Sequence, residues 1–196
     1  AVDRINDEKL ASLSARAHSF AMSATGPSVL TDALKRGCLS PETLALKEGA
    51  IVMCTKNNPA VGYVNGTLGS VIGYELGTGY PIIETRDGRE MVIAPVDWAV
   101  EENGKVRAKL AQIPLRLAWA ITVHKSQGMS MDAAAMDLSR AFEYGQGYVA
   151  LSRVRTLQGL RLLGWSEGAM QVHPEVLKVD RSFREQSEGA RRAFEA

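Results

Sequence analysis

Cysteine, histidine and long apolar runs are all scarce in this sequence of 196 residues. Two cysteines, Cys38 and Cys54, are too few for a disulfide framework, and no Cys/His cluster has the spacing of a metal site. No stretch of 18 apolar residues exists, so no segment spans a membrane. The N-terminal AVDRINDEKLASL is charged and amphipathic, unlike a signal peptide. We therefore expect a cytoplasmic chain with two buried free thiols, no membrane partner and no metal site of its own.

The signatures of a self-sufficient nucleotide-binding domain are also missing. A phosphate-binding loop requires G-x-x-x-x-G-K-[ST], but the single Gly-Lys pair, Gly104-Lys105, is followed by Val106. No acidic residue follows an apolar strand as a Walker B aspartate would, since Asp7-Glu8 lies in a predicted helix. The chain also lacks an initiator Met, so we expect a domain excised from a longer protein.

Charge is unevenly distributed along the chain, although its formal net charge is only +1. Residues 1–100 hold nine basic and eleven acidic groups, whereas residues 101–165 hold nine basic and five acidic groups. The basic excess of the second segment suits a polyanionic partner, although scattered Lys and Arg are more often solvated surface.

The segment from residue 49 to 112 has the texture of a small β-barrel. Short apolar runs alternate with turn residues, and two dipeptides, Asp87-Gly88 and Asn103-Gly104, are typical of tight hairpins. Several short strands in about 60 residues predict a curled barrel of SH3-like size. Before it, residues 2–17 predict an amphipathic helix and residues 29–36 a short second helix.

The segment from residue 113 to 165 has an α/β pattern. IPLRLAWAITV (113–123) is continuously apolar, as expected of a buried strand in a parallel sheet. A second strand is predicted at 132–138, a helix at 142–156 and a strand at 160–163. The polar tail, residues 166–196, predicts a helix. We therefore divide the chain into residues 1–48, the inserted barrel 49–112, the α/β part 113–165 and the tail 166–196.

Polar residues gather directly after the first of these strands, in ITVHKSQG (121–128). Ligands bind beyond the carboxyl ends of strands in α/β sheets, and free N–H groups at a following helix start favour an anion. Lys125 adds a positive charge, Ser126 and Gln127 add neutral donors, and Gly128 allows close backbone approach. A solvated polar loop without a ligand is the competing interpretation.

A second set of candidates lies in GQGYVALSRVRT (145–156). Arg153 and Arg155 are two residues apart, so on a helix they point to different sides and serve different purposes. The guanidinium of Arg153 can offer a planar fork to a phosphate group. Two surface arginines in ordinary ion pairs would carry the same pattern.

Together these segments resemble motifs V and VI of superfamily 1 DNA helicases of the Pif-type and RecD-like branch. The resemblance rests on LAWAITVHKSQGMSMDAAAMDLSRAF and GQGYVALSRVRTLQGLRLLG, and extends upstream through LKEGAIVMCTKNN and VDRINDEKL. The Pif-type branch fits better, because Ser130 stands where RecD-like proteins often have Glu. The resemblance covers residues 1–165.

The resemblance implies a fold and a division of labour. The fold would be α/β, a RecA-like second motor domain with an inserted SH3-like barrel, working as a monomer with a first RecA-like domain that this chain lacks. His124, Lys125 and Ser126 would lie along single-stranded DNA, and Gln127 and Gly128 would face the nucleotide. Arg153 would be the catalytic arginine finger. ATP and Mg²⁺ would be held only together with the first domain, and translocation would run 5′ to 3′.

Two other functions fit parts of the sequence. The chain could be a non-catalytic module that binds single-stranded nucleic acid through its barrel, although residues 1–100 carry a net charge of −2. A hydrolase using Ser126 or Ser152 with His124 would need an orienting third group and a nucleophile elbow, and the sequence shows neither.

Overall fold

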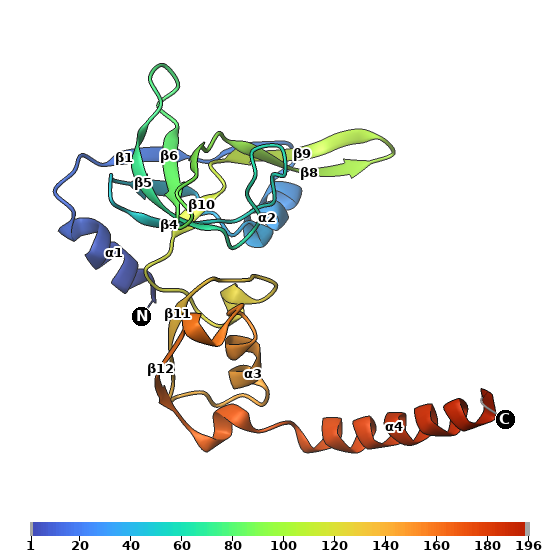
Figure 1. Cartoon of the computed structure of the whole chain (residues 1–196). Coiled ribbons are helices and arrows are strands. Elements are labelled where there is room, and N and C mark those ends of the chain that lie inside the picture. The colour runs from blue at the N-terminus through green and yellow to red at the C-terminus, as the bar shows by residue number, and fades with distance from the viewer. Residues whose placement is uncertain (1, 195–196) are drawn as a thin grey trace. The chain divides into compact units, whose positions relative to one another are not determined.

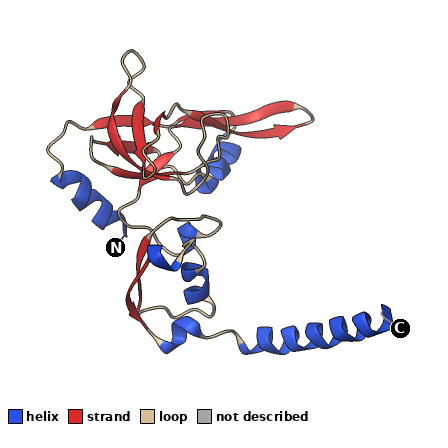
Figure 2. Ribbon diagram, in the orientation of Figure 1, coloured by secondary structure: helices blue, strands red, loops and turns tan. Residues whose placement is uncertain are grey.

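The computed structural model describes residues 2–194 and divides the chain into two units, Ala1–Met131 and Asp132–Ala196 (Figure 1). The strands of the first unit pair antiparallel, whereas the second unit combines one parallel strand pair with helices (Figure 2). The division of the sequence into residues 1–48, 49–112, 113–165 and 166–196 stays a prediction.

The largest sheet of the first unit has five antiparallel strands in the order β10-β4-β5-β6-β7. Their bounds are Ile51–Cys54 (β4), Leu68–Tyr74 (β5), Pro81–Thr85 (β6), Glu90–Val92 (β7) and Leu115–Leu117 (β10). Two smaller antiparallel sheets, β1-β3 and β2-β9-β8, complete the strands of this unit. Their bounds are His18–Ala21 (β1), Ser23–Thr25 (β2), Thr43–Leu46 (β3), Val96–Glu102 (β8) and Lys105–Gln112 (β9).

Both predicted hairpin turns are confirmed. Residues 86–89, which include Asp87-Gly88, join β6 to β7, and Asn103-Gly104 joins β8 to β9. Asn103 has φ of 52° and Gly104 has φ of 72°. Two successive residues with positive φ match the right-handed twist of a tight hairpin, which explains why Asn-Gly stands there.

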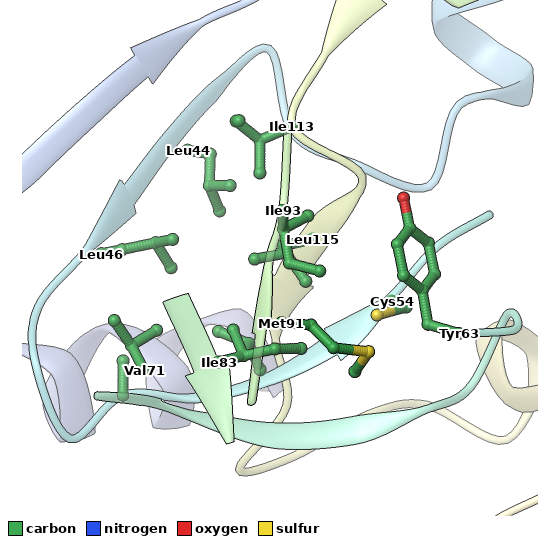
Figure 3. Close-up of a cluster of buried hydrophobic side chains, with 12 residues drawn as sticks. Leu44, Leu46, Cys54, Tyr63, Val71, Ile83, Met91, Ile93, Ile113 and Leu115 are labelled. Atoms are coloured by element: carbon green, nitrogen blue, oxygen red, sulfur yellow. The ribbon is translucent and has the colours of Figure 1, made fainter. Parts of the chain in front are cut away.

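The main hydrophobic cluster of the first unit lies between its strands (Figure 3). Alternate strand residues point inward, because side chains in a strand alternate between its two faces. The largest fully buried members are Leu44, Leu46, Val52, Tyr63, Val71, Ile83, Ile93, Ile113 and Leu115. Cys54 belongs to the same cluster, and burial raises the pKa of its thiol to about 12. The prediction of a buried free thiol is confirmed for Cys54, whereas Cys38 is only partly buried.

The predicted N-terminal helix is shorter than expected. Helix α1 spans Val2–Ser12, and residues 18–21 form β1, which pairs with β3 from His18↔Leu46 to Ala21↔Thr43. The helical prediction for residues 13–17 is wrong, because these residues connect α1 to β1, which pairs with β3. The second predicted helix is confirmed as α2 (Ser28–Gly37), which packs against β9.

The prediction of a parallel strand over 113–123 is also wrong. Only Leu115–Leu117 forms a strand, and it pairs antiparallel with β4, with Leu115 opposite Cys54. Its apolar residues belong to the core of the first unit, since Ile113 and Leu115 are fully buried there. A continuous apolar run indicates burial but does not define the direction of pairing.

The second unit follows the predicted strand–helix–strand order. Strands β11 (Ala134–Leu138) and β12 (Leu160–Trp165) pair in parallel, with helix α3 (Gln146–Leu151) between them in sequence. Helix α3 is shorter than the predicted 142–156, because Gly145 precedes it with φ of 74° and a turn follows it at Ser152. The remaining elements are the short helices η2 (Leu157–Gly159) and η3 (Glu167–Met170), and the predicted tail helix α4 (Pro174–Phe194).

Within residues 2–194, none of the helices combines the length and apolar character needed to cross a membrane.

Candidate functional site

The first candidate segment forms a tight turn after Ala120 rather than the start of a helix. His124–Ser126 is a single 3-10 turn (η1), and Gly128 follows with φ of 76°. The amide of Lys125 donates to the Thr122 hydroxyl at 3.2 Å, and the amide of Ser126 donates to the Thr122 carbonyl at 3.1 Å. The amides of Gln127 and Met129 donate to His124 and Ser126. The prediction of free N–H groups at a helix start is therefore wrong for these four residues.

Four residues of this turn are exposed and one is buried. His124 and Lys125 are exposed, as are Gln127 and Gly128, so four of the five predicted residues face solvent. Ser126 is only 3% exposed, and its hydroxyl donates to the Val123 carbonyl at 2.7 Å. The hydroxyl of Ser126 thus fixes the turn. The contact of Ser126 with DNA stays a prediction. Such a contact requires that DNA reach the free lone pairs of the Ser126 hydroxyl oxygen, or that the hydrogen bond to Val123 open.

A buried asparagine holds the chain in place just before this turn. Asn6 of α1 donates to the Ala120 carbonyl at 2.9 Å and accepts from the Ala120 amide at 3.0 Å. Asn6 is 4% exposed, so both backbone groups of Ala120 are satisfied by one side chain 114 residues away. This clamp sets where the turn begins. Sequence reasoning missed it, because an asparagine on a charged helix carries no signal of such a contact.

A pocket of about 440 Å³ opens beside the turn, within the first unit. Helix α1 lines it with Asp3, Asn6 and Asp7, and Lys125 and Arg116 lie on its wall. Arg116 is 7% exposed although it carries a charge. Its position inside the apolar run PLRLAW was the signal that could have singled it out, since a charged residue is rarely buried without a partner.

The second candidate segment packs closely because of a glycine. Gly147 of α3 lies against η3, where an added Cβ would come within 2.1 Å of the Ala169 carbonyl oxygen. Only glycine permits this approach, and it positions the end of α3, from which Arg153 follows. The Nε of Arg153 donates to the Val149 carbonyl at 2.9 Å, and its Nη2 donates to the Ser152 hydroxyl at 2.9 Å.

Arg155 has a different partner from Arg153, as their spacing suggested. Its Nη1 lies 3.1 Å from Asp132 Oδ1, and both side chains are more than half exposed. This ion pair joins the turn after α3 to the segment that precedes β11. It is a surface contact, so it contributes little to stability.

The two candidate segments lie in different units: His124–Gly128 in the first and Arg153 in the second. The contacts given for each segment are those within its own unit. Within residues 2–194, no three His, Cys, Asp or Glu side chains gather as a metal site would require.

Comparison with known proteins identifies the relatives of this fold and these motifs. The family described as "DNA helicase Pif1, 2B domain" matches residues 30–74. The ATP-dependent DNA helicase Pif1 of Psychrobacter sp. (strain PRwf-1) is 36% identical over 99% of this chain and 37% of its own length. The ATP-dependent DNA helicase PIF1 of Homo sapiens is 41% identical over 91% of this chain and 28% of its own length.

Solved structures agree with the sequence matches. Unliganded Pif1 from Bacteroides sp superposes with a TM-score of 0.80 at 28% identity, covering 93% of this chain and 43% of that one. Other structures of Bacteroides Pif1 are complexes with ADP-AlF4 (TM-score 0.78, 28% identity) and with ssDNA (TM-score 0.64, 30% identity). These cover 94% and 96% of this chain, and 43% and 44% of theirs.

The chain therefore corresponds to part of a superfamily 1 helicase. Within that class it belongs to the Pif1-type helicases and corresponds to their C-terminal part. It spans well under half the length of the Psychrobacter and human relatives that it matches.

Proposed function

We propose that this chain supplies the second motor domain of an ATP-dependent 5′–3′ DNA helicase, with an arginine finger and contacts to single-stranded DNA. The observation that carries the proposal is identity of 36% over 99% of the chain to a protein that is an ATP-dependent DNA helicase. The exposed pair His124 and Lys125, held on a fixed turn, supports a surface for DNA. The complexes of Bacteroides Pif1 with ADP-AlF4 and ssDNA support both ligand classes.

In this proposal the nucleotide site is divided between two domains. The first RecA-like domain holds ATP and the ligands of Mg²⁺, because residues 2–194 offer no cluster of metal ligands. The metal ion, when bound, neutralises charge that develops on the phosphates. Arg153 releases Val149 and Ser152 and offers its planar guanidinium to the γ-phosphate. Gln127 and Gly128 face the same nucleotide from the exposed side of their turn.

The finer fold is part of the same proposal. The parallel pair β11-β12 would be the edge of a larger RecA-like sheet, since a two-stranded sheet is marginal by itself. Trp165 of β12 is 60% exposed and Leu163 is 61% exposed, as expected where further strands or helices cover them. The antiparallel sheets around β4–β9 would be the SH3-like insertion, and the match of residues 30–74 to a 2B domain supports that position.

Binding of a single strand tests the DNA part of the proposal. Lys125→Ala is expected to weaken binding of a labelled 15-nucleotide strand and to reduce the slope of log K against log[salt] by about 0.7, the value of one phosphate contact. Lys178→Ala removes the same charge from α4 and serves as the matched control. Equal losses in both variants would show that the effect is general charge and not a contact at the turn.

Hydrolysis by the chain alone tests the division of the nucleotide site. We expect no ATP turnover from the purified 196-residue chain, because it has neither a phosphate-binding loop nor a Walker B aspartate. Turnover is measured with and without single-stranded DNA. A rate that Arg153→Ala abolishes would contradict the proposal, since a contaminating ATPase would be indifferent to that substitution.

A further inference from the structure

Arg116 is a buried charge that forms no ion pair within the described residues 2–194. Its side chain is 7% exposed, its Nε has no hydrogen-bond partner, and it forms no ion pair with any of the residues 2–194. Burial lowers the pKa of this guanidinium, and the negative charge of Asp3 acts in the opposite direction. A guanidinium nevertheless stays protonated in proteins. Burying it unpaired is costly, so a partner from outside the described chain is the expected compensation.

The pocket beside Arg116 has room for such a partner. Its volume is about 440 Å³, and Lys125 brings a second positive charge to its wall. Two neutral polar groups of the pocket are already engaged: Asn6 with Ala120, and the hydroxyl of Ser40 with that of Thr55 at 2.7 Å. Arg116 is therefore the unsatisfied donor of the pocket.

The remaining charges of the pocket do not neutralise Arg116. Asp3, Asp7 and Lys125 are all exposed, so solvent screens these three charges, and neither carboxylate forms an ion pair with Arg116. The Cys38 thiol is neutral, because burial raises its pKa. The strongest unscreened charge is thus positive, and apolar residues such as Leu44 and Leu117 line the same pocket. A guanidinium fork and an ammonium group that line one partly apolar pocket are groups that bind phosphate.

We propose that this pocket is a phosphate site, in which Arg116 and Lys125 together bind one phosphate group. The group is either a phosphodiester of a bound strand or a free phosphate. The first source rests on the proposed function and makes Arg116 a further DNA contact beside the turn at His124–Gly128. The second source is independent of it.

The Nε–Hε group of Arg116 gives a direct readout in ¹⁵N NMR spectra of the 196-residue chain. Its resonance is assigned from its loss in Arg116→Met. Titration with inorganic phosphate at constant ionic strength is expected to shift it saturably, with little change in Arg107, an exposed arginine on β9. A dT15 strand is expected to shift it at lower concentration, and methylphosphonate linkages should remove that shift. An unmoved Arg116 resonance with both phosphate and dT15 overturns the proposal.

The variants separate this proposal from the proposed function. Arg116→Met and Arg116→Lys should each weaken phosphate binding at least about tenfold, whereas Arg107→Met should not. Arg116→Met should also unfold at the same temperature as wild type or higher without phosphate, because it replaces an unpaired buried charge. A lower unfolding temperature for Arg116→Met, with phosphate binding retained in Arg116→Lys, would make Arg116 structural and overturn the site.

Each of the two sources of the phosphate group can be contradicted independently of the other. If wild type binds dT15 but Arg116→Met binds it equally with the same salt slope, the strand does not use this pocket and the phosphodiester source is wrong. If wild type binds phosphate at Arg116 but no dT15, the phosphate site stands with a free phosphate as its source, and the DNA contact of the proposed function fails.

Discussion

Arg153→Ala is expected to lower ATP hydrolysis by about 10³- to 10⁵-fold in a protein that joins this chain to the first motor domain. An arginine finger stabilises charge that develops on the transferring phosphoryl group, so its loss affects the rate far more than substrate binding. The measurement is kcat for DNA-stimulated hydrolysis, together with affinity for a single strand. DNA affinity is expected to change little, because the proposal assigns the nucleotide to Arg153 and the DNA contacts to His124 and Lys125.

Two hydrogen bonds of Arg153 bear on this role. They go to neutral acceptors, the Val149 carbonyl and the Ser152 hydroxyl. Each such bond contributes about 1 kcal/mol net, less than a charge-assisted bond to a phosphate.

Two variants sharpen the result for Arg153. Arg153→Lys keeps the charge but loses the planar fork, so it should recover only a small part of the rate. Arg155→Ala is the matched control, since it removes an arginine two residues away whose exposed ion pair with Asp132 contributes at most about 1 kcal/mol. If Arg155→Ala lowers the rate as strongly as Arg153→Ala, or Arg153→Ala leaves it intact, the assignment of the finger to Arg153 is wrong.

Local sequence signals predicted the hairpins because turn chemistry is a local property. Asn103-Gly104 and Asp87-Gly88 place residues that tolerate positive φ between two runs of strand formers, and both turns formed. The parallel pair β11-β12 was likewise anticipated from its short apolar runs and the helix between them. In each case neighbouring residues contain the cause of the structure.

Elements that depend on distant contacts could not be predicted in the same way. The run 113–123 was correctly expected to be buried, but its antiparallel pairing with β4 depends on a sheet edge that lies about 60 residues earlier. The clamp between Asn6 and Ala120 joins residues 114 apart. The closed N–H groups of the turn at His124–Ser126 depend on the hydroxyl and carbonyl of Thr122, which a motif reading does not resolve.

The packing of α3 leads to the second large effect, which concerns stability. Gly147→Ala is expected to destabilise the second unit by roughly 1–3 kcal/mol, the usual cost of overpacking. The added Cβ would lie 2.1 Å from the carbonyl oxygen and 2.8 Å from the carbonyl carbon of Ala169. Both are backbone atoms, so no flexible side chain can move aside, and α3 and η3 must separate.

Hydrogen exchange of the full chain measures this effect unit by unit. Amides of α3, β11 and β12 should lose protection in Gly147→Ala, while those of β4 and β5 in the first unit should not. Gly189→Ala is the control, because nothing lies within 4 Å of its added Cβ and alanine favours the interior of α4 by up to about 1 kcal/mol. Unchanged protection in Gly147→Ala would mean that α3 and η3 are not in contact.

Because Arg153 follows α3 by two residues, a real separation should also lower ATP hydrolysis in the joined protein. Unlike Arg153→Ala, Gly147→Ala should therefore reduce stability and rate together, which distinguishes loss of position from loss of the guanidinium.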